Sequence, residues 1–300
     1  MTSSSTPTLP SSLDSASVRT ARIVIQPTRG ILRIDWQGLV EYRDLLFLLV
    51  RRDFLSKYKQ SILGPAWFVI NPLVTTIVFS VIFGNIAKLP SDGMPKMLFY
   101  LCALVPWNYF ATNLTATSTT FTANMNLFGK VYFPRLIVPL SVVVSNLITF
   151  AIQLVAFLCF FFYYKFFTAA GALVRPSLEL ALVPFLLLQV ALLSLGLGLG
   201  ISALTAKYRD LAHAMGFVAQ LWMYATPVVY PLSMVTNPRW RIVAALNPMT
   251  SVVESFKHAF LGVGTVSLVY TSISVGITLV VLFLGLVLFS RAERTFVDTV

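Results

Sequence analysis

The sequence predicts an all-α integral membrane protein with six transmembrane helices, an N-terminal amphipathic interfacial helix and a short re-entrant or interfacial hairpin before the last span. Three observations predict this class. Hydrophobic residues make up 57% of the chain and charged residues 11%, with a mean hydropathy of +0.81, whereas a soluble domain carries about 25% charged residues. Apolar runs of membrane-crossing length recur along the chain. Lysines and arginines lie mainly between these runs.

The N-terminal part is predicted to stay outside the bilayer core. Residues 1–35 are expected to form a disordered or extended cytoplasmic tail, because their Ser-, Thr- and Pro-rich start has no apolar core and does not resemble a signal peptide. Residues 36–61 are expected to form an amphipathic helix in the cytoplasmic interface, with Leu39, Leu45, Leu46 and Leu49 near helical spacing. The basic and aromatic residues of interest on this helix are Arg51, Arg52, Lys57, Tyr58 and Lys59.

The remainder, residues 62–300, is predicted to be one six-helix transmembrane domain. A helix needs about 20 apolar residues to cross roughly 30 Å of hydrocarbon. The expected spans are 66–87, 97–119, 136–164, 178–205, 212–234 and 265–290, and Pro227 and Pro231 interrupt the fifth. The Thr-rich stretch 112–122 is expected to face protein or water rather than lipid. The glycines of 196–200 predict close helix packing.

One segment is helical in pattern but cannot span the membrane. Residues 248–261 follow Asn247 as a cap, carry Pro248 in the first turn and stop at Gly262. The segment is too short and too polar to cross, so we expect an interfacial or re-entrant hairpin with a solvated polar face. The polar residues on that face are Glu254, Lys257 and His258.

The distribution of lysine and arginine predicts the orientation. With six spans, 15 of the 22 basic residues lie on the side of the N-terminus and seven on the other. Because cytoplasmic loops carry the excess of positive charge, both termini are predicted to be cytoplasmic. The net charge of +11 is therefore a membrane feature, and we expect no nucleic-acid partner.

Several kinds of chemistry are missing from the sequence. The interiors of the expected spans hold no Asp, Glu, Lys, Arg or His; Glu179 and His213 are each the second residue of a span. This argues against a proton-driven transporter, while sodium coupling through amides and carbonyls stays open. The Gly129-Lys130 pair lacks the upstream glycine of a phosphate-binding loop. We therefore expect no cofactor, metal or catalytic residue in this chain.

Two links on the cytoplasmic side combine charge with aromatic or apolar residues. The first, NLFGKVYFPR at 126–135, is too apolar for a free loop and too short for a domain. It is either a docking site for a cytosolic partner or an interfacial turn. Its residues are Asn126, Leu127, Phe128, Gly129, Lys130, Val131, Tyr132, Phe133, Pro134 and Arg135, and the second link contains Lys207, Tyr208, Arg209 and Asp210.

Aromatic residues are abundant, with 24 Phe, 11 Tyr and 5 Trp. Those near the ends of spans are typical of interfacial belts. Alternatively they line a conduit for a sugar polymer, since the CH faces of sugars pack on aromatic rings. The possible conduit residues are Trp67, Trp107, Tyr109, Tyr224 and Tyr230.

From residue 41 to residue 296 the chain resembles the permease subunits of polysaccharide and polyol-phosphate ABC exporters, the group that includes O-antigen, capsule and teichoic-acid transporters. The stretches that carry the resemblance are YKQSILGPAW (58–67), LVPWNYFATNL (104–114), NLFGKVYFPRLIVPL (126–140), KYRDL (207–211), TPVVYP (226–231) and LNPMT (246–250). Each is weak alone, but six in order make a specific match.

The resemblance implies a homodimer in the inner (plasma) membrane, joined to two copies of a separate ABC ATPase that binds ATP and Mg²⁺. It implies that a lipid-linked glycan is exported, that residues 126–135 form the coupling helix, that the 38–60 segment also contacts the ATPase, and that residues 237–261 are outer gate helices. Two alternatives stay open. One is a membrane enzyme acting on a lipid-linked sugar through Glu254 and His258, and the other is an ABC exporter of a small hydrophobic substrate.

Overall fold

The computed structural model describes residues 36–57, 59, 61–131 and 133–297 of the chain. The regular structure of these residues is helical throughout, without a strand, so the predicted all-α class is confirmed. Four helical segments are long and apolar enough to cross a membrane: Gly64–Ile86, Ile137–Phe167, Leu178–Thr205 and Leu268–Arg294. The other two expected spans correspond to the helices α4 and α9.

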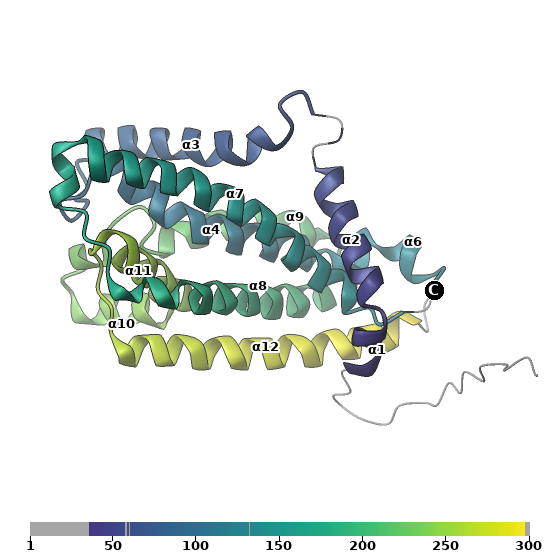
Figure 1. Ribbon diagram of the computed structural model, residues 1–300. Coiled ribbons are helices and arrows are strands. Elements are labelled where there is room, and N and C mark those ends of the chain that lie inside the picture. The colour runs from purple at the N-terminus through teal and green to yellow at the C-terminus, as the bar shows by residue number, and fades with distance from the viewer. Residues whose placement is uncertain (1–35, 58, 60, 132, 298–300) are drawn as a thin grey trace, which may run out of the picture.

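The long helices run side by side along one direction, and short ones close the two ends (Figure 1). At one end lie α2, α6 and the last turns of α12, and at the other lie α10 and α11. The helices are α1 (Trp36–Glu41), α2 (Arg43–Ser56), α3 (Trp67–Phe79), α4 (Lys96–Ser118), α5 (Thr120–Ala123), α6 (Met125–Phe128), α7 (Ile137–Phe167), α8 (Val183–Thr205), α9 (Asp210–Ala225), α10 (Pro238–Leu246), α11 (Pro248–Leu261) and α12 (Leu268–Val297).

The predicted N-terminal helix is present but divided at Tyr42 into α1 and α2. Leu49 is buried, and Leu39, Leu45 and Leu46 pack against the core, where α2 contacts α7. Its interfacial location stays a prediction. The predicted tail and Tyr58 lie outside the described residues.

Helix α4 is the centre of the bundle. Every side chain from Leu98 to Trp107 is buried, because α3, α7, α8, α9 and α11 all pack around this helix. A helix enclosed by protein needs less apolar surface than one facing lipid. Its Thr-rich end contacts protein as predicted, since Thr117 and Ser118 are fully buried.

Glycines let α8 approach two neighbours closely. A Cβ at Gly285 of α12 would lie 2.0 Å from the carbonyl oxygen of Gly196, and one at Gly198 would meet Thr117 of α4. Only hydrogen fits at such contacts, which is why small residues mark helix interfaces in membranes. The packing role predicted for the 196–200 stretch is confirmed.

The fifth expected span was placed too far along the chain. Helix α9 ends at Ala225 rather than near residue 234, and residues 226–231 are not helical. Pro227 restricts the residue before it, and Thr226 accordingly takes an extended conformation with ψ 145°. The apolar pattern of the sequence continues past residue 225 because Val228 and Val229, although not helical, are buried in the core.

Candidate functional site: the two ends of the bundle and the groove between them

Helix α11 begins and ends as the sequence predicts. The Asn247 side chain caps it by accepting a hydrogen bond from the Met249 amide at 3.1 Å, and Gly262 ends it with a φ of +74°. The cap also ties α11 to α9. The Asn247 amide donates to the Thr226 hydroxyl at 2.9 Å, and its oxygen accepts from the Trp222 indole at 3.2 Å. A local capping signal thus also fixes the end of α9.

The expected solvated face of α11 is wrong. Glu254 is only 2% exposed and Lys257 only 1%, because α4, α8 and α12 surround this helix. The two side chains form a buried ion pair, with Lys257 Nζ 3.2 Å from Glu254 Oε1. Buried charges persist when they are paired and hydrogen-bonded. The polarity that suggested a solvated face is neutralised inside the protein.

Each member of the pair also holds a neighbouring segment. Lys257 Nζ donates to the Pro227 carbonyl at 2.6 Å and lies 4.2 Å from the centroid of the Phe99 ring on α4. Glu254 Oε2 accepts from the Thr265 amide at 2.9 Å, in the connection to α12. Burial lowers the pKa of Lys257, and the carboxylate of Glu254 opposes that shift.

His258 lies outside this buried pair. Its Nδ1 lies 2.9 Å from Glu179 Oε2, in the 3₁₀ turn that leads into α8, and both side chains are about one-third exposed. The sequence-based alternative of an enzyme used Glu254 and His258 together. In the structure they have different partners, so they do not form an acid–base pair.

At the opposite end of the bundle, the link at 126–135 has an inner and an outer face. Phe128 and Phe133 are buried; their centroids are 5.9 Å apart, and Phe128 also packs on Phe121. Arg135 lies over the Phe128 ring at 5.4 Å and donates from Nη1 to the Glu293 carbonyl of α12 at 3.1 Å. Leu127 and Pro134 are half-buried. Tyr132 is outside the described residues.

The outer face of this link is formed by Asn126, Gly129, Lys130 and Val131, all of which are exposed. The second link exposes Lys207, Tyr208, Arg209 and Asp210. Thr205, at the end of α8, donates to the Ser118 carbonyl at the end of α4 at 2.7 Å. The two links therefore leave the bundle close together, and their role in docking stays a prediction.

The five aromatic residues predicted for a conduit have different surroundings. Tyr109 is buried, with its hydroxyl donating to the Val143 carbonyl at 3.2 Å, so it packs inside the protomer. Trp67 and Tyr224 are 44% and 43% exposed. Tyr230 is half-buried, and burial followed by the nearby Glu254 carboxylate raises the pKa of its phenol. Trp107 lines a groove between α4 and α9.

This α4–α9 groove has a volume of about 330 Å³ and offers both polar and apolar groups. The hydroxyls of Thr112 and Thr115 and the amide of Gln220 are accessible there and can hydrogen-bond sugar hydroxyls, while the Trp107 indole is only 3% exposed. Sequence analysis missed most of these residues, although the Thr-rich stretch of α4 was a signal. The lining residues are Trp107, Ala111, Thr112, Thr115, Gly216, Ala219, Gln220 and Met223.

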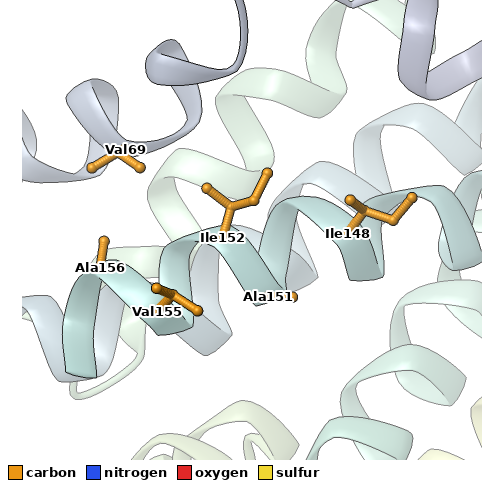
Figure 2. A pocket seen from close by; sticks show the side chains of 6 residues that line it. All are labelled: Val69, Ile148, Ala151, Ile152, Val155 and Ala156. Carbon is orange, nitrogen blue, oxygen red and sulfur yellow. The ribbon is translucent and has the colours of Figure 1, made fainter. Parts of the chain in front are cut away.

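A second groove lies between α3 and α7 (Figure 2). It measures about 410 Å³, with Val69 on α3 facing five residues of α7. All its lining side chains are apolar, so it offers a sugar no hydrogen bond and is suited to hydrocarbon. They are Val69, Ile148, Ala151, Ile152, Val155 and Ala156.

A comparison with known protein families matches residues 44–261 to the family described as ABC-2 type transporter. The match covers more than two-thirds of the chain and includes every helix from α2 to α11. The chain belongs to the ABC-2 type transporter family. It is therefore a multi-pass membrane protein of a transport family, as its apolar helices indicate.

Relatives of this ABC-2 transporter include permeases named for polysaccharide export. It is 31% identical to the O-antigen export system permease protein RfbA of Myxococcus xanthus, over 74% of this chain and 82% of the relative. It is 27% identical to RfbA of Klebsiella pneumoniae, over 85% and 94%. It is 24% identical to the polysialic acid transport protein KpsM of Escherichia coli, over 84% and 93%.

This ABC-2 transporter also has a polar contact between α2 and the bundle that sequence reasoning did not find. Lys57, just after α2, donates to the side-chain oxygen of Asn146 on α7. Asn146 in turn donates to Asn113 of α4 at 2.7 Å. A lysine that reaches an amide within the bundle ties α2 to α7. The amides of Asn113 and Asn146 were noticeable in the sequence, but their pairing depends on the fold.

Proposed function

We propose that this chain is the membrane-spanning subunit of an ATP-driven exporter that moves a lipid-linked polysaccharide across the inner membrane. The observation that carries the proposal is that relatives named for O-antigen and polysialic acid export match more than four-fifths of this chain, at nearly their full length. The four apolar segments together with α4 and α9 make the six spans of this proposal, with both termini cytoplasmic.

The α4–α9 groove is proposed as the surface that the polymer contacts. It lies on the outside of a single protomer, next to the exposed apolar residues Phe217, Leu221 and Tyr224 of α9. Two protomers that bring these faces together would bury the apolar residues and turn two open grooves into one lined path. This supports a homodimer, whose exported substrate is a polymer of O-antigen, capsule or teichoic-acid type.

Energy is proposed to come from a separate ABC ATPase that carries ATP and Mg²⁺. The part of the chain that the structure describes has no buried charged side chain apart from Glu254 and Lys257, and these are engaged with each other. The exposed outer face around Lys130 and the adjacent link at 207–210 are the proposed docking surface. Closure of an ATPase pair would move these links relative to the helices.

The test is co-purification combined with depletion in the source cell. The tagged chain is purified in mild detergent, and its partners are identified by mass spectrometry. We expect a stoichiometric chain with a phosphate-binding loop, and we expect depletion of this subunit to remove the surface polysaccharide while lipid-linked polymer accumulates inside. Repeated recovery without an ATPase would overturn the exporter. An ATPase partner with unchanged surface polymer would overturn the substrate and favour a small hydrophobic one.

A further inference from the structure

We propose that the buried pair Lys257–Glu254 locks α11, residues 226–231 and residues 264–265 into one rigid unit, here called the α11 junction, with Lys257 as the positioning residue for 226–231 and Glu254 as that for 264–265. The proposal rests on the proposed function only for the statement that this unit forms the outer end of an export path. Its structural content, a local lock made by one buried ion pair, can be tested without any transport assay.

The carbonyl of Pro227 accepts its hydrogen bond from Lys257. Helix α9 has ended at Ala225, so this buried carbonyl has no place in a helical hydrogen-bond pattern. The Val228 amide turns back to the Thr226 carbonyl at 2.6 Å instead. Lys257 Nζ, at 2.6 Å, donates to the Pro227 oxygen. A buried carbonyl without a donor is costly, so the path of residues 226–231 depends on this contact.

The same ammonium group has other partners. Lys257 Nζ also contacts Glu254 Oε1, and the Phe99 ring lies 4.2 Å from it. An ammonium group has three donors, and a buried one needs all of them directed to partners. One atom therefore joins three elements: α11, α4 and the chain that leaves α9.

The unit extends to the start of α12. Glu254 Oε2 accepts from both the amide and the hydroxyl of Thr265, at 2.9 and 3.4 Å. Gly264 has a φ of +121°, and a Cβ there would lie 2.8 Å from the Glu254 carbonyl. The chain before α12 thus packs closely against the turn of α11 that carries Glu254. Movement of α11 must carry both flanking segments with it or break these bonds.

The charged and titratable groups around this centre are few among the described residues. Asp92, in the α3–α4 connection, accepts a hydrogen bond from Ser233 at 2.7 Å and adds an attractive charge to Lys257. Cys102 of α4 and Tyr230 are the remaining titratable neighbours of the pair. Asp92 acts on the ammonium only through its charge, whereas Glu254 is hydrogen-bonded to it, so the lock depends on the Lys257–Glu254 pair.

The pair also explains why charge is retained in a site otherwise filled by apolar side chains. Val252, Val253, Phe256 and Phe260 surround it on α11 and are buried. Apolar residues of similar volume often replace a buried ion pair without loss of stability. They cannot donate a hydrogen bond to Pro227, however. The charge is therefore assigned to positioning of residues 226–231, which carry Tyr230, rather than to stability.

The experiment uses the full-length chain with its co-purified partner and measures amide hydrogen–deuterium exchange by mass spectrometry. Lys257→Met leaves Glu254 buried and unpaired, so this variant is expected to fold poorly. The double variant Glu254→Gln with Lys257→Met removes both charges at nearly constant volume. It still leaves the Pro227 carbonyl without its donor, so it is expected to fold with a thermal stability below that of the parent but above that of Lys257→Met. The control is His258→Ala on the same helix, which loses only the contact with Glu179.

In the double variant, exchange at the amides of residues 228–230 and 264–266 is expected to rise roughly tenfold or more, while α4 and α8 keep their protection. His258→Ala should leave residues 228–230 unchanged. Unchanged exchange at residues 228–230 in a stable double variant would overturn the proposal. An equal rise over the whole bundle would also overturn it, because the pair would then stabilise the fold in general. Failure of the export function would show in the co-purification and depletion experiments and not in these exchange rates.

Discussion

Charge reversal at two positions of the link at 126–135 should separate docking from folding. Lys130 and Arg135 lie five residues apart and carry the same charge, but Lys130 is exposed whereas Arg135 turns inward onto Phe128 and α12. Lys130→Glu is therefore expected to weaken attachment of the ATPase without loss of stability. Arg135→Glu is expected to destabilise the chain itself.

The magnitudes follow from the contacts. Arg135 makes a hydrogen bond of a charged group to the Glu293 carbonyl, which contributes about 1.5–3 kcal/mol. Its position over the Phe128 ring adds about 0.5–1 kcal/mol. The ion pair with Glu293 is long, at 3.9 Å, and the Glu293 side chain is 36% exposed, so it adds little. The expected loss for Arg135→Glu is about 2–4 kcal/mol, against less than about 0.5 kcal/mol for the exposed Lys130→Glu.

The assay compares thermal unfolding of each purified variant with the ATP hydrolysis of the assembled complex. Lys130→Glu should unfold like the parent and reduce partner-stimulated hydrolysis several-fold. Because salt screens exposed charges, this reduction should be largest at low salt concentration and smaller at high salt concentration. Arg135→Glu should lower the unfolding temperature of the chain itself, whether or not the ATPase is attached. A stable Lys130→Glu variant with unchanged ATP hydrolysis and transport would refute the docking role of this surface.

Three further changes test the fold and the groove. Gly285→Ala must move α12 away from α8, since its Cβ would lie 2.0 Å from a carbonyl oxygen, and we expect thermal unfolding to show a loss of about 1–3 kcal/mol in stability. The control Gly276→Ala on the same helix meets nothing within 4 Å and should leave the stability unchanged. Lys57→Met leaves an amide oxygen of α7 without its donor and should cost about 1–3 kcal/mol by the same measurement; an unchanged unfolding temperature would remove the link between α2 and the bundle. Thr115→Trp fills the α4–α9 groove and should abolish polymer export, whereas Ala151→Trp in the apolar α3–α7 groove should leave export intact; equal effects of the two would disprove the assignment of the grooves.

Local signals in the sequence predicted local structure well. The bounds of α11 follow from Asn247, Pro248 and Gly262, because capping depends on residues adjacent in the chain. The close contact of α8 followed from its glycines. The end of α9 was misplaced because hydropathy counts buried residues whether or not they are helical, and Pro227 was a stronger signal than the apolar residues after it.

Burial of α11 depends on which helices surround it, and periodicity within one segment does not report that. A signal was present all the same. Glu254 and Lys257 are opposite charges three residues apart in a run of buried valines and phenylalanines, and this spacing places both on one helix face. Such a pair is compatible with burial when the rest of the face is apolar. The partner contacts at Pro227 and Thr265 come from segments that no sequence pattern brings together.

The structure also restricts how the two ends of the bundle can communicate. Helix α4 contacts both: Phe99, near its start, lies against Lys257, and the Ser118 carbonyl at its end accepts a hydrogen bond from Thr205, beside the links at 126–135 and 207–210. Its side chains are buried over most of its length, and close-packed interiors shift between discrete arrangements rather than deform continuously. A displacement of the links relative to α11 must therefore move α4 as a whole or break one of these end contacts. If export survives the loss of the Lys257 contact, the conformational signal passes through another helix. Helix α8 is the next to test, because it packs against both α4 and α11.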